Sequence, residues 1–78
     1  MGYRVLLVED EPQMADFLVR GLREEGFTVE HAADGAAGGH FLDTQSWDVV
    51  LLDRRLPDLD GVSLLPRLRG PDRHTPVL

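Results

Sequence analysis

The chain has 78 residues, of which 42% are hydrophobic, and a formal net charge of -6. So short a chain buries only a thin core, and its negative charge disfavours binding of this segment to nucleic-acid phosphates or to an anionic membrane. Cysteine is absent, which excludes disulfides, thiolate-bound zinc and thiol catalysis. Because no apolar stretch approaches the ~20 residues of a membrane span, we expect a cytoplasmic protein.

The first strand and helix are predicted from residues 3–26. Tyr3–Val8 is apolar without alternation, which is typical of a strand covered on both faces. Pro12 suits the first turn of a helix, and Gly26 is expected just past its end. Apolar or small residues recur at helical spacing between them: Met14, Phe17, Leu18, Gly21 and Leu22. Of these we expect Phe17, Leu18 and Leu22 in the core.

The next strand and helix follow a turn signal. Phe27–Ala32 is predicted to be a strand, and Asp34-Gly35 the turn after it. Residues Ala36–Gln45 should form the second helix, although Gly38 and Gly39 weaken it by roughly 1 kcal/mol each relative to alanine.

The last predicted elements lie between residues 47 and 78. Trp47 is expected at the rim, just before a third strand at Asp48–Asp53. A loop over residues 56–61 leads to a short helix at Val62–Arg69, which Pro66 should bend. Val77-Leu78 resembles the opening of a fourth strand. The alternation of strands and helices predicts an α/β domain with a parallel sheet and right-handed crossovers.

Acidic residues follow two of the predicted strands. Glu9 and Asp10 leave the first strand, and Asp53 leaves the third. In parallel sheets the functional site lies outside the carboxyl ends of the strands, so these carboxylates should share one pocket and repel one another. Mg²⁺ would relieve that repulsion. Asp53, alone at its strand end, is the expected nucleophile toward phosphorus.

Five motifs together resemble the receiver domain of bacterial two-component response regulators: VLLVEDE at 5–11, AADG at 32–35, VVLLD at 49–53, LPDLDG at 56–61 and TPVL at 75–78. The resemblance covers essentially the whole chain and implies a flavodoxin-like doubly wound sheet of order 2-1-3-4. The stretch EEGFTVEHAADG at 24–35 further resembles receivers joined to a winged-helix DNA-binding domain.

The resemblance implies a role for each acidic residue. Asp53 would accept a phosphoryl group from a sensor histidine kinase, while Asp10 and Asp53 bind Mg²⁺ directly and Glu9 assists through water. Arg55 would offer its backbone carbonyl to the metal. In a complete domain this is autophosphotransfer rather than the work of a turnover enzyme.

The family pattern also includes residues that this sequence lacks. A Ser or Thr ending the fourth strand would lie beyond Leu78, and the lysine ending the fifth has no counterpart, because all eight basic residues are arginines. We therefore expect residues 1–78 to be the N-terminal part of a receiver domain, without a second domain. An exposed apolar face and an open strand edge would then favour a homodimer, a strand-exchanged oligomer or marginal stability. The alternative function is a non-switching remnant that acts as an association module.

Simpler or competing interpretations exist for most of these residues. The acids at 9–11 could be a solvated turn before a helix N-terminus. Arg54 and Arg55 are expected to be solvated, although the Arg55 guanidinium could reach a phosphoryl group on Asp53. Asp58 and Asp60 should serve the turn, and a topoisomerase-primase type of metal site is disfavoured. No phosphate-binding loop motif of nucleotidases is present, and His31, His40 and His74 lack the spacing of metal ligands.

Overall fold

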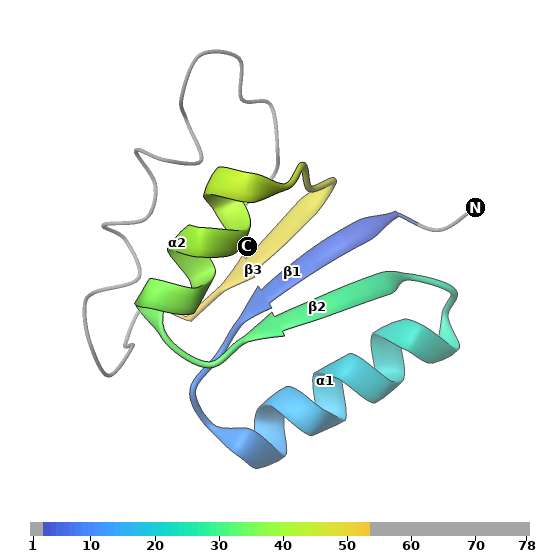
Figure 1. The fold of residues 1–78 in the computed structure, drawn as a ribbon. Helices are drawn as coiled ribbons and strands as arrows, with labels where there is room; N and C mark the ends of the chain where they lie inside the picture. Colours follow the sequence, from blue (N-terminus) through green and yellow to red (C-terminus); the bar gives the residue numbers. More distant parts are fainter. Residues whose placement is uncertain (1–2, 54–78) are drawn as a thin grey trace.

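The computed structural model describes residues 3–53, which form a three-stranded parallel sheet. The strands are β1 (Arg4–Val8), β2 (Thr28–Ala32) and β3 (Val49–Leu52), arranged in the order β2-β1-β3. β1 is therefore the central strand, hydrogen-bonded on both sides (Figure 1). The predicted strand order 2-1-3 is confirmed; the predicted fourth strand and third helix lie outside the described residues.

The register of the sheet aligns the ends of its strands. Val5 lies opposite Val29 and Val49, and Val8 lies opposite Ala32 and Leu52. Each strand begins or ends within two residues of its sequence prediction, because β-branched and apolar runs fit a sheet that is covered on both faces. The aligned carboxyl ends bring the residues that follow β1 and β3 to one edge.

Two helices cover opposite faces of this sheet (Figure 1). α1 (Pro12–Glu24) packs Ala15 against Val5, Leu7 and Val29, whereas α2 (Gly35–Thr44) packs Leu42 against Leu6, Val8 and Val50. Alternate residues of β1 thus enter two separate apolar clusters, as the period of a strand requires. This is the predicted α/β architecture.

α1 corrects one prediction about the core. Phe17 was expected to be buried, but it is 72% exposed, and Met14 is 49% exposed. The stripe that packs against the sheet runs instead through the buried Ala15 and the partly buried Leu18, Val19 and Leu22, which have the spacing i, i+3, i+4, i+7. Phe17 lies one helical step, about 100°, from Leu18 and so faces away from the sheet. Gly26 ends the turn as predicted, with φ of 94°.

α2 begins one residue earlier than predicted, at Gly35. The Asp34 carboxylate accepts a hydrogen bond of 2.8 Å from the Ala37 N–H and so caps the first turn. Gly38 and Gly39 are both buried within a continuous helix.

Aromatic and charged side chains close the amino-terminal edge of the sheet. Trp47 is 7% exposed and belongs to the α2-side core, so it lies deeper than the predicted rim position. Its indole N–H donates to the Phe41 carbonyl at 3.0 Å, and the Arg4 guanidinium lies 4.6 Å from the ring centroid. Arg4 also donates to Gln45 through its guanidinium and to Asp48 through its backbone N–H. This edge is opposite the predicted site.

Within residues 3–53, neither helix is long and apolar enough to cross a bilayer.

Candidate functional site

Glu9 and Asp53 are each held by backbone hydrogen bonds just past the strands that precede them. The Glu9 N–H donates to the Ala32 carbonyl at 3.0 Å, and the Asp53 N–H donates to the Val8 carbonyl at 2.9 Å. The ladder of the sheet therefore extends one residue beyond β1 and β3. Both side chains leave from backbone that the central strand fixes, rather than from unsupported loops.

Three carboxylates gather at this edge. One oxygen from each of Glu9, Asp10 and Asp53 lies within 4.8 Å of the other two, with Glu9 and Asp53 half-buried and Asp10 exposed. Like charges this close repel one another, and a hard divalent cation with oxygen ligands offsets that repulsion. The structure therefore brings together the three acidic side chains that the sequence singled out.

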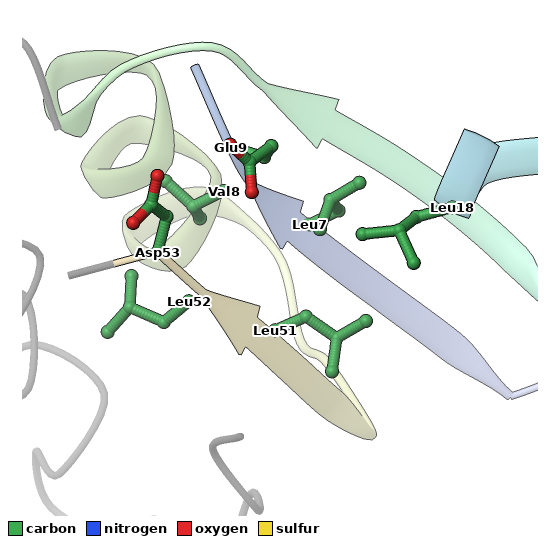
Figure 2. Close-up of a pocket in the computed structure, with 7 residues that line it drawn as sticks. All are labelled: Leu7, Val8, Glu9, Leu18, Leu51, Leu52 and Asp53. Atoms are coloured by element: carbon green, nitrogen blue, oxygen red, sulfur yellow. The ribbon is translucent and has the colours of Figure 1, made fainter. Parts of the chain in front are cut away.

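Apolar side chains form the wall beside the carboxylates. The cavity next to Glu9 and Asp53 is lined by Leu7, Val8, Leu18, Leu51 and Leu52. Figure 2 shows the two acids at the ends of β1 and β3, with Leu18 reaching in from α1 toward Leu7 and Leu51. These side chains bound one side of the charged groups, which are otherwise partly exposed to water.

Glu11 has a structural role, although it continues the acidic run. Its carboxylate accepts hydrogen bonds from the N–H groups of Gln13 at 2.9 Å and Met14 at 3.2 Å, and so caps α1. Its own N–H donates to a Glu9 carboxylate oxygen at 3.2 Å. The interpretation of the acids as a turn before a helix N-terminus therefore fits Glu11, whereas Glu9 and Asp10 face Asp53.

His31 contacts the site in a way that the sequence did not reveal. Its Nε2 lies 2.7 Å from the Glu9 carbonyl oxygen, and because a carbonyl only accepts, Nε2 is the donor. His31 lies opposite Leu7 in the β1–β2 register, two residues before Glu9. Only knowledge of this register would have singled it out among three scattered histidines.

The remaining predicted residues lie outside residues 3–53. These are Arg54 and Arg55, Asp58 and Asp60, and His74.

Comparison with known proteins gives the family. The model of the response regulator receiver domain matches residues 5–78. The chain is 47% identical over 77 residues to the transcriptional regulatory protein TcrA of Mycobacterium tuberculosis. The alignment covers 99% of this chain but 30% of TcrA. It is 37% identical over 75 residues to the transcriptional regulatory protein CusR of Escherichia coli, with 96% of this chain and 33% of CusR covered. The chain thus spans about a third of the length of these curated relatives.

Solved structures show the same fold. The receiver domain of the Francisella response regulator 1452 superposes with a TM-score of 0.88 at 34% identity, over 97% of this chain and 63% of that one. The receiver domain of the sensor histidine kinase PA1611 of Pseudomonas aeruginosa was solved with a magnesium ion coordinated in its active site cleft. It superposes with a TM-score of 0.89 at 34% identity, over 99% of this chain and 65% of that one. The chain belongs to the receiver domain family of two-component response regulators.

Proposed function

We propose that Asp53 accepts a phosphoryl group from the phosphohistidine of a sensor kinase in a Mg²⁺-dependent reaction. The observation that carries this proposal is the approach of three carboxylate oxygens to within 4.8 Å at the ends of two adjacent strands. Membership of the receiver family supports it, as does the magnesium ion in the cleft of the PA1611 receiver.

The residues present suit Mg²⁺ by their chemistry. All three offer carboxylate oxygens, which Mg²⁺ prefers, and the exposed Asp10 leaves room for the waters that this ion retains. We assign Asp10 and Asp53 as direct ligands. Glu9 acts through water, in agreement with the use of one of its oxygens by the Glu11 N–H. Arg55, which lies outside the described residues, stays a proposed ligand through its carbonyl.

The chemistry at Asp53 is a displacement at phosphorus. A carboxylate oxygen forms the new bond to phosphorus while the bond from phosphorus to the donor imidazole nitrogen breaks, and its electron pair stays with that nitrogen. The bound cation supplies neutralisation of the negative charge on the phosphoryl oxygens. The backbone hydrogen bond from Asp53 to Val8 keeps the nucleophile at the sheet edge during this exchange.

The signalling context follows from the same relatives. TcrA and CusR are transcriptional regulators of which this chain matches 30% and 33%. We infer that residues 1–78 are the N-terminal part of a cytoplasmic receiver that controls a DNA-binding effector domain, of the winged-helix kind.

Intact-mass measurement after incubation with Mg²⁺ and acetyl phosphate tests this proposal. The expected result is the mass increase of one phosphoryl group, lost in an Asp53→Asn variant and in excess chelator. Asp48→Asn is a matched control, because Asp48 lies at the other end of β3 and bonds to Arg4. A mass increase that survives Asp53→Asn would refute the assignment, and no increase in any sample would favour the non-switching association module.

A further inference from the structure

Strand β2 holds both polar groups of the Glu9 backbone. The Glu9 N–H donates to the Ala32 carbonyl at 3.0 Å, as the sheet ladder requires. The Glu9 carbonyl then accepts a hydrogen bond of 2.7 Å from the His31 side chain. The imidazole thus ties β2 to the chain one residue after β1 ends, where the loop toward α1 begins.

That carbonyl belongs to the peptide between Glu9 and Asp10. Because a peptide unit is planar, a hydrogen bond to its oxygen restrains the orientation of the whole unit. The Cα atoms of Glu9 and Asp10 lie in that plane, so the direction in which each carboxylate leaves the backbone depends on it. One contact from His31 therefore influences two of the three carboxylates that approach one another.

We propose that His31 is a positioning residue of the acidic site, which orients the Glu9–Asp10 peptide so that both carboxylates converge with Asp53 on a divalent cation. The inference rests on the proposed Mg²⁺ site and adds to it a residue on a different strand. His31 acts through its hydrogen bond to the backbone and is not itself a ligand.

The exposure of His31 separates this role from a role in core packing. Its side chain lies at the surface of the edge strand and belongs to neither apolar cluster. Removal of the ring should therefore leave the fold intact while it releases the peptide. This allows metal affinity and stability to be measured as separate quantities.

Calorimetric titration of the chain with Mg²⁺ tests the inference in four variants. His31→Ala removes the donor, and His31→Gln places an amide N–H at about the reach of Nε2. His40→Ala is a matched control, because it removes an exposed histidine on α2 rather than the donor to Glu9. Asp53→Asn tests the metal site itself. Trp47 fluorescence, at the opposite edge of the sheet, reports folding in each variant.

The expected result is a rise in the Mg²⁺ dissociation constant of about three- to tenfold in His31→Ala, the effect of one lost hydrogen bond. His31→Gln should restore most of the affinity, and His40→Ala should leave it unchanged. In NMR spectra of the metal-free chain, the backbone amide resonance of Asp10 should shift in His31→Ala and return to its parent position in His31→Gln.

Two results would overturn the inference in distinguishable ways. If His31→Ala binds Mg²⁺ as the parent does, while Asp53→Asn binds it weakly, the positioning role fails and the metal site stands. If the parent chain itself does not bind Mg²⁺, both the proposed function and the role of His31 fail.

Discussion

Replacement of Asp53 by asparagine should stabilise the metal-free chain. Asp53 lies within 4.8 Å of carboxylate oxygens of both Glu9 and Asp10, so it takes part in two repulsive pairs. At that separation each pair of unit charges costs ~1 kcal/mol in a water-like dielectric, which suits this partly exposed site. Screening by salt lowers the total repulsion energy of the two pairs from ~2 to about 1 kcal/mol. For a domain of this size, the gain corresponds to a rise in Tm of about 4–8 °C.

Magnesium should reverse this order of stability. A ligand that binds only the folded chain at a hundred times its dissociation constant stabilises by about 2.7 kcal/mol. The parent chain should gain that amount, whereas Asp53→Asn lacks a ligand and should gain much less. The variant should therefore melt above the parent in chelator and below it in Mg²⁺.

Thermal unfolding followed by circular dichroism, at low and moderate salt, measures both effects. Asp16→Asn is the control, because Asp16 is 63% exposed and forms a surface ion pair with Arg20 at 3.2 Å, of small energetic value. If Asp53→Asn melts no higher than the parent in chelator at low salt, the carboxylates do not converge as described. Equal stabilisation of both chains by Mg²⁺ would exclude Asp53 as a ligand.

Four further substitutions test the framework around the site. Arg4→Ala should destabilise the chain by about 1 kcal/mol and change Trp47 fluorescence, because it removes the guanidinium that lies 4.6 Å from the centroid of the indole ring. It should leave the Mg²⁺ affinity unaltered, and unchanged fluorescence would count against that contact. Glu11→Ala should lower the free energy of unfolding by about 1 kcal/mol through loss of the α1 cap, and amide hydrogen exchange should be faster at Gln13 and Met14. Equal exchange rates in the variant and the parent would contradict the capping role. Gly21→Ala and Gly26→Ala should shift Tm in opposite directions. Gly21 is helical and a Cβ added there meets open space, so alanine stabilises by up to ~1 kcal/mol, whereas Gly26 has φ of 94° and alanine costs about 1–2 kcal/mol. A shift of the same sign in both would refute that reasoning.

The sequence was most informative where one local cause dominates. The apolar runs before Glu9 and Asp53 are short, continuous and rich in valine, which favours strands over helices, so the carboxyl edge of the sheet could be predicted. Gly26 could be predicted for the same reason, since few other residues adopt a positive φ after a helix. These local signals placed the acidic residues correctly at one edge.

The sequence was least informative where the outcome depends on how elements pack. Phe17 and Leu18 are adjacent apolar residues, and only the angle of α1 against the sheet decides that Leu18 packs, partly buried, against the core while Phe17 is 72% exposed. His31 reaches Glu9 through the register of two strands that are separated by a whole helix. Residue type does not tell Glu11 apart from Glu9 and Asp10; the signal that could have assigned it the cap is its place directly before Pro12, where α1 begins.

The convergence of Glu9, Asp10 and Asp53 on a divalent ion can be tested most directly with Mn²⁺ as a paramagnetic substitute for Mg²⁺. We predict that substoichiometric Mn²⁺ broadens the backbone amide resonances of these three residues much more than the indole resonance of Trp47, whose backbone precedes Asp53 by six residues, roughly 20 Å of extended chain. Excess Mg²⁺ should reverse the broadening. Broadening that is centred on other acidic residues, such as Glu24 and Glu25, or that is absent at Asp53, would contradict the account.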